Sequence, residues 1–311
     1  MARGRGSRDR IAGPYLSLPL DRSPAAGSLG PTEDSLVPTE PTRLVRSPDG
    51  TPIAVFSSGD GSPLVLVHGA AADHTTFRVV GPMFAGRHAV HAIDRRGRGA
   101  SGDTPEYDVG REFDDVAAVV DELARETGRE VDVVGHSFGG RCGLGAALRT
   151  EHLRRLVVYE GAPAPAETPY QDPDVLPRLN ALKAAGRNEE LLSNFLARVV
   201  GMSQPDLEAY RASPVWPLRV AAAPTIVREL HAEASAAADL ATLGTVGQPV
   251  LQILGGVSRD EFRLATEALD ARLADGRVLV IDGAKHAAHH THAQQFVDSI
   301  EAFLAEPDMA D

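Results

Sequence analysis

The sequence contains only one cysteine, Cys142, among its 311 residues. A single cysteine excludes a disulfide bond within the chain and is typical of proteins in a reducing compartment. No stretch approaches the roughly 18 consecutive apolar residues of a membrane-spanning helix. The first ten residues are basic, but the apolar segment of a signal peptide does not follow them. We therefore expect a cytoplasmic protein with no membrane partner.

Positive charge is also scarce. Lys and Arg together number 31 against 43 Asp and Glu, which gives a net charge of -12. Nucleic acids and anionic membranes are bound through clustered Lys and Arg, so we expect no nucleic-acid partner. The hydrophobic content of 43% is ordinary for a globular protein with a substantial core. This composition favours a small-molecule substrate and leaves the oligomeric state open.

The character of the chain changes near residue 40. Residues 1–40 are rich in Pro, Gly, Ser and Arg without hydrophobic periodicity, which predicts a disordered tail. A hairpin turning at Asp49-Gly50 follows, and short apolar runs then alternate with segments of helical period. This alternation predicts an α/β protein with a mostly parallel central sheet and helices on both faces. The apolar runs expected to be strands cover 64–67, 89–93, 131–136, 156–159, 250–254 and 277–281.

The long segment 162–247 interrupts this alternation because it has almost no strand pattern. We interpret it as a helical lid (cap) inserted between a core of residues 41–161 and 248–311. A helical packing layer with no site beneath it is the alternative. The candidate helices in the segment cover 176–185, 189–200, 205–212 and 225–238. Four of its large side chains suggest an apolar pocket but suit helix packing equally well: Phe195, Met202, Tyr210 and Trp216.

The stretch Gly135-His-Ser-Phe-Gly139 directly follows an expected strand and opens an expected helix. In G-x-S-x-G, a tight strand-to-helix turn lifts the serine hydroxyl above the sheet. The helix N-terminus adds partial positive charge where an oxyanion would form. Small residues in a turn also occur for packing reasons, but the position of this motif predicts that Ser137 is a catalytic nucleophile.

Four motifs in order resemble those of the α/β-hydrolase superfamily in its lid-bearing form, over roughly residues 43–304. They are Val67-His-Gly-Ala70, Asp94-Arg-Arg-Gly-Arg-Gly-Ala-Ser101, the turn around Ser137, and Gly283-Ala-Lys-His286. The resemblance implies that His286 is the general base. It also implies an oxyanion hole formed by the backbone N–H groups of Ala70 and Phe138, and it implies no cofactor.

A metal site is the competing interpretation of the histidines that follow His286, namely His289, His290 and His292. Zinc sites usually combine spaced ligands with a second cluster or a carboxylate. We therefore expect no metal here.

The residue that departs from the family pattern is the triad acid. The family usually supplies it as G-x-x-D after the strand at 250–254, where this chain has Gly255-Gly-Val-Ser258. Asp260 lies two residues further on. Glu160 ends the strand at 156–159, where branches such as the haloalkane dehalogenases carry their acid. We expect Glu160 to be the acid, with Asp260 as the alternative. A structural glutamate, ion-paired with Arg141 for example, is the competing role for Glu160.

A serine at the nucleophile position favours acyl transfer to water. We expect hydrolysis of an ester, lactone or thioester of a small to medium apolar substrate through an acyl-enzyme. Lyase, cyclase or C–C-bond chemistry at the same serine and histidine is the alternative, and a non-catalytic binding protein is a third, because fold alone does not determine function. Arg141 lies one turn beyond Ser137, and we expect it to pair with a carboxylate or to bind a substrate anion.

Overall fold

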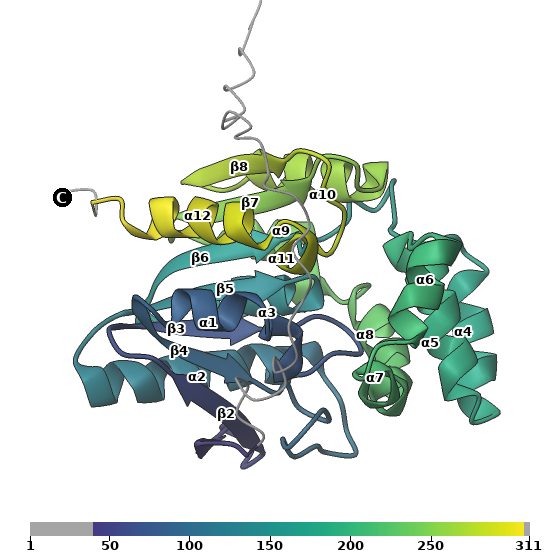
Figure 1. The fold of residues 1–311 in the computed structure, drawn as a ribbon, viewed down its shortest axis with the longest axis horizontal. Helices are drawn as coiled ribbons and strands as arrows, with labels where there is room; N and C mark the ends of the chain where they lie inside the picture. Colours follow the sequence, from purple (N-terminus) through teal and green to yellow (C-terminus); the bar gives the residue numbers. More distant parts are fainter. Residues whose placement is uncertain (1–39, 308–311) are drawn as a thin grey trace, which may run out of the picture.

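The computed structural model describes residues 40–307, in which eight strands form one sheet (Figure 1). The strand order is β1-β2-β4-β3-β5-β6-β7-β8. β2 pairs antiparallel with both β1 and β4, and every other neighbouring pair is parallel. The strands are β1 (Arg43–Arg46), β2 (Pro52–Ser58), β3 (Ser62–Val67), β4 (His88–Ile93), β5 (Val131–His136), β6 (Leu153–Tyr159), β7 (Val250–Gly255) and β8 (Gly276–Ile281). The mostly parallel sheet predicted from the sequence is confirmed, whereas the predicted tail lies, except for Glu40, outside the described residues.

Helices cover both faces of the sheet because the central strands are apolar on both sides. Along β3, Val65 and Val67 pack into one apolar cluster and Leu64 and Leu66 into another, as the period of two in a strand requires. The first cluster includes side chains of α2 and α3, and the second includes α1 and α12. The helices outside the 162–247 segment are α1 (Val80–Phe84), α2 (Val109–Thr127), α3 (Phe138–Ala147), α10 (Asp260–Asp270), α11 (Ala288–Thr291) and α12 (Ala293–Leu304).

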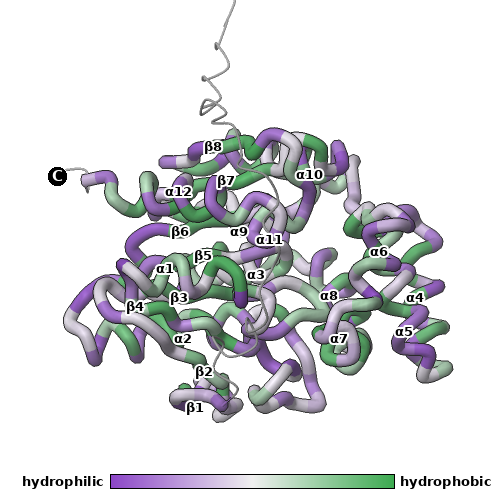
Figure 2. Tube along the Cα trace, in the orientation of Figure 1, coloured by the Kyte–Doolittle hydropathy of each residue, from purple (hydrophilic) through white to green (hydrophobic). Residues whose placement is uncertain are grey.

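The segment between β6 and β7 is helical in the structure, and its helices α4 to α7 lie beside the sheet rather than over either face (Figure 1). Its last elements return to the core, since α9 contacts α3 and the preceding 3-10 turn, η5 (Ala236–Ala238), contacts α2. In Figure 2, apolar and polar stretches alternate along these helices. The α-helices are α4 (Val175–Ala184), α5 (Asn188–Phe195), α6 (Gln204–Arg211), α7 (Trp216–Ala222), α8 (Ile226–Ala232) and α9 (Leu240–Leu243). We call residues 162–247 the helical insertion.

Two details of the helical insertion differ from the sequence-based expectation. The helix expected at 225–238 ends at Ala232, and a separate 3-10 turn covers Ala236–Ala238. Helix α7 was not predicted, because Pro217 suggests a break. Pro217 instead occupies the first turn of α7, where a backbone N–H has no partner within the helix. No helix within residues 40–307 is both long enough and apolar enough to span a membrane.

Candidate active site

Ser137 stands at a strained turn between β5 and α3. Its backbone has φ 55° and ψ -127°, a conformation that residues other than glycine adopt only when their surroundings enforce it. The Ser137 N–H donates to the carbonyl of Tyr159 at 2.8 Å, which fixes the turn to the neighbouring strand. A Cβ at Gly139 would lie 2.2 Å from the carbonyl oxygen of Val67, so only glycine fits there. The turn therefore presents the Ser137 side chain at the end of β5.

Glu160 follows β6 directly, also with a positive φ, of 45°. Its side chain is buried, and its two oxygens have different partners. Oε1 accepts a hydrogen bond from the N–H of Gly255 at 2.8 Å, and Oε2 lies 2.5 Å from Nδ1 of His286. The structure thus joins the end of β6, the end of β7 and the loop after β8 at one carboxylate. Because Nδ1 of His286 donates to Glu160, its Nε2 is left as the acceptor nitrogen.

Asp260 faces solvent and is not positioned to act as the triad acid. It is the first residue of α10, its side chain is 84% exposed, and its carboxylate pairs with Arg263 at 3.4 Å. It forms no hydrogen bond to His286 within the described part of the chain. The alternative acid expected from the sequence is thus not brought to the histidine, whereas Glu160 is. Glu160 also forms no ion pair with Arg141, the competing role considered for it.

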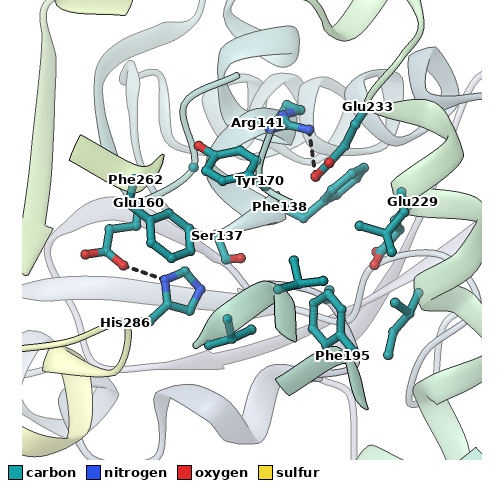
Figure 3. Close-up of a pocket in the computed structure, with 16 residues that line it drawn as sticks. Ser137, Phe138, Arg141, Glu160, Tyr170, Phe195, Glu229, Glu233, Phe262 and His286 are labelled. Carbon is teal, nitrogen blue, oxygen red and sulfur yellow. Dashed lines mark hydrogen bonds and ion pairs between the residues drawn. The ribbon is translucent and has the colours of Figure 1, made fainter. Parts of the chain in front are cut away.

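Ala70 and Phe138 line the same pocket as Ser137 and His286 (Figure 3). The loop after β3 passes very close to the serine, because a Cβ at Gly69 would lie 2.8 Å from the Cβ of Ser137. This close approach brings the backbone beside Ala70 near the serine, which Phe138 directly follows in the chain. The direction of their N–H groups toward an oxyanion stays a prediction.

Two residues that the sequence did not single out hold the loop of the base. His136 contacts the backbone carbonyl of His286 through Nε2 at 2.9 Å. The Tyr159 hydroxyl donates to the carbonyl of Lys285 and accepts from the N–H of Ala288 at 2.8 Å. Burial holds the pKa of His136 well below its usual range, so its ring is neutral and its Nε2–H donates to that carbonyl. The backbone on both sides of His286 in the sequence is thus held by side chains from β5 and β6.

Among the histidines after His286, His289 packs with His136 and Tyr159. His289 is buried with its ring 4.5 Å from that of His136, and burial also lowers its pKa well below the usual value. Within residues 40–307, no group of three or more His, Cys, Asp or Glu side chains is arranged to hold a metal ion. The geometry therefore describes a packed support for the base.

The pocket also has a charged end, formed where the helical insertion meets the core. Nη1 of Arg141 pairs with Oε1 of Glu233 at 3.0 Å, and Nη2 donates to the carbonyl of Ala162 at 3.2 Å. The guanidinium of Arg141 lies near the rings of Phe138 and Tyr170, at 5.6 and 6.0 Å from their centroids. The carboxylate partner expected for Arg141 is therefore present, and it comes from the segment after α8.

Glu229, one turn before Glu233, is held more tightly. Its Oε1 accepts from Arg95 at 2.6 Å and from Arg98, and both arginines also pair with Glu112. Burial raises the pKa of Glu112, but the two arginines outweigh this effect and lower it to about 2. The Asp94–Ser101 loop, expected to be structural, thus supplies the cations that anchor α8. Glu229 and Glu233 were missed because their only signal, a four-residue spacing, also suits a solvated helix face.

Between the two ends the pocket wall is apolar and comes largely from the helical insertion (Figure 3). Of the four large insertion residues considered from the sequence, Phe195 lines this wall, while Tyr210 and Trp216 pack edge-to-face with ring centroids 5.6 Å apart. Cys142 is buried, and burial raises the pKa of its thiol to about 12. The thiol therefore stays protonated and is not a second nucleophile. The apolar side chains of the wall are Phe195, Val199, Val200, Ile226, Leu230 and Phe262.

Comparison with known proteins finds relatives along most of the chain. The model of the family described as "Alpha/beta hydrolase family" matches residues 64–299. A pimeloyl-(acyl-carrier protein) methyl ester esterase from Aeromonas hydrophila is 28% identical over 259 residues, covering 81% of this chain and 99% of that protein. The crystal structure of an alpha/beta hydrolase from Sphaerobacter thermophilus is 30% identical with a TM-score of 0.72, covering 85% of this chain and 100% of that one.

Proposed function

The chain belongs to the α/β-hydrolase family and is an esterase-like hydrolase, and we propose that it cleaves its substrate through an acyl-enzyme on Ser137. The observation that carries this proposal is the Glu160–His286 pair beside a serine held on a strained turn. A serine hydroxyl becomes a good nucleophile only when a base takes its proton, and this arrangement supplies the base.

In the proposed mechanism, Nε2 of His286 accepts the proton of Ser137 as Oγ attacks the ester carbonyl. Glu160 holds the imidazole in the required tautomer and stabilises the imidazolium that forms. The N–H groups of Ala70 and Phe138 stabilise the oxyanion of the tetrahedral intermediate. His286 then protonates the leaving alcohol, and a water molecule activated by the same histidine releases the acid. This mechanism predicts a separation of about 2.6–3.2 Å between Oγ of Ser137 and Nε2 of His286 in the reactive complex.

The helical insertion acts in this proposal as a lid over the strand ends. Its apolar side chains, such as Phe195 and Leu230, form the wall across from the serine and suit the methylene groups of a small to medium acyl chain. The relative from Aeromonas hydrophila, named for a methyl ester, supports a carboxylic ester as substrate. The absence of the usual aspartate after β7 would favour the lyase and C–C-bond alternatives, but Glu160 offers a carboxylate to His286 in its place.

Turnover of p-nitrophenyl acetate and p-nitrophenyl butyrate tests the proposal. The wild-type protein should hydrolyse one or both, and Ser137→Ala and His286→Ala should each lower kcat by roughly 10³-fold or more, because each removes a member of one catalytic unit. Ser58→Ala, an exposed serine at the end of β2, serves as the matched control and should keep full activity. Near-full activity of folded Ser137→Ala would overturn the mechanism.

A further inference from the structure

Arg141 is an unusual residue to find in an apolar pocket beside a nucleophile. Its side chain is 4% exposed, and it lies four residues after Ser137, in the first turn of α3. Both residues line the same pocket, and four helical residues rise by about 6 Å along the axis. Figure 3 shows the guanidinium beside the Tyr170 ring, on the side of the pocket opposite His286. A group bound to Arg141 would therefore lie within one short chain of Ser137.

The guanidinium is held in place by more than its ion pair. The carbonyl of Ala162 accepts from Nη2, and the rings of Phe138 and Tyr170 flank the cation. The Tyr170 hydroxyl donates to the same carbonyl at 2.5 Å. Nε has no hydrogen-bond partner within residues 40–307. Arg141 thus keeps its position if its carboxylate partner leaves, and it has unused capacity to donate to an anion.

The carboxylate partner, Glu233, is held by fewer contacts than Arg141. It lies at the end of α8, its side chain is 23% exposed, and one oxygen contacts Arg141. Burial raises the pKa of Glu233, and the opposing effect of Arg141 does not restore it. Glu229, by contrast, is fully buried and held by two arginines. Of the two glutamates, Glu233 is the one that an incoming anion can replace.

We propose that Arg141 binds a carboxylate on the acyl part of the substrate and that Glu233 occupies this position until the substrate arrives. The substrate class is then a half-ester of a short dicarboxylic acid, with the ester carbonyl at Ser137, the methylenes against the apolar wall and the free carboxylate at Arg141. A guanidinium suits this task because its planar fork donates two parallel hydrogen bonds to a carboxylate. This inference rests on the proposed function, because it names the substrate of the same site.

Initial rates with two series of methyl esters test the inference. The monomethyl esters of succinic, glutaric and adipic acid carry a free carboxylate, and methyl butyrate, methyl valerate and methyl hexanoate are neutral controls of comparable length. For at least one chain length, the wild-type kcat/KM should favour the half-ester by tenfold or more. In Arg141→Gln this ratio should fall at least tenfold, because the KM of the half-ester rises. In Glu233→Gln the KM of the half-ester should decrease, because the competing carboxylate is gone. A wild-type ratio near one, or a ratio that Arg141→Gln leaves unchanged, would overturn the inference.

Arg141→Gln leaves Glu233 without its cation, so the double variant Arg141→Gln/Glu233→Gln provides the same test with both charges removed. Binding to Ser137→Ala separates the inference from the proposed function, because no ester is consumed. Calorimetry should show monomethyl glutarate binding at least tenfold more tightly than dimethyl glutarate, and adding Arg141→Gln should abolish the difference. Equal binding of the two esters contradicts the anion site even if esterase activity is found. A difference without turnover by the wild-type protein supports the anion site and contradicts the proposed function.

Discussion

The two ends of the pocket are built by different kinds of contact. At the reactive end, Ser137 and Glu160 directly follow the neighbouring parallel strands β5 and β6, and His286 lies in the loop after β8. At the charged end, Arg141 and the cations of the Asp94–Ser101 loop meet glutamates at α8, on the helical insertion. Sheet geometry alone places the first group. The second depends on how the insertion docks on the core.

This difference predicts different responses to mutation. At the reactive end, the side chains are held by strained backbone and by hydrogen bonds to β7, so a substitution should change catalysis more than stability. At the charged end, buried ion pairs join two segments far apart in sequence, so a substitution should change how the insertion is held. Each of the following experiments tests one side of the comparison.

The largest effect is expected for Glu160→Gln. The amide cannot stabilise the imidazolium of His286 and favours the wrong tautomer, so kcat should fall by roughly 10³–10⁴-fold. Asp260→Asn is the matched control, since Asp260 is exposed and paired only with Arg263 among the described residues, and it should cost less than about twofold. Steady-state kinetics with a p-nitrophenyl ester measures both. The reverse ranking would assign the acid role to Asp260.

A smaller effect, on stability, is expected for Glu229→Gln. Removing one carboxylate from a buried cluster leaves Arg95 and Arg98 with Glu112 alone, which should lower the free energy of unfolding by about 3 kcal/mol. Asp206→Asn is the control, because Asp206 also joins the insertion to the core, through Lys285 at 3.0 Å, but is 53% exposed.

The control should lower the free energy of unfolding by about 1 kcal/mol or less, since exposed ion pairs contribute little. Urea denaturation measures both variants. Equal effects would mean that the buried cluster does not anchor the insertion.

The reactive end was predictable from the sequence because local patterns encode it. The turn around Ser137 combines a strand, two glycines and a helix start, and parallel strand ends converge at one edge of a sheet. The same rule favoured Glu160, at the end of β6, over Asp260. Asp260 fails because α10 begins with it, and an acidic residue in a first helical turn is already favourably placed there, facing solvent.

The charged end was not predictable in the same way. Glu229 pairs with Arg95, a residue 134 positions away, and no periodicity links the two. Arg141 was noticeable because a cation is unusual in a buried helix, but its partner Glu233 lies beyond the end of α8, where the sequence predicted that the helix continues. Such pairs depend on tertiary contacts between segments whose docking no local pattern describes.

The central claim is that Ser137 forms a covalent acyl-enzyme. The most direct measurement is mass spectrometry of the protein after it is mixed with p-nitrophenyl butyrate and quenched in acid within milliseconds. The account predicts a mass increase of one butyryl group, located on the peptide that contains Ser137, and no increase in Ser137→Ala. Turnover without any such adduct, or an adduct on another residue of the wild-type protein, would contradict it.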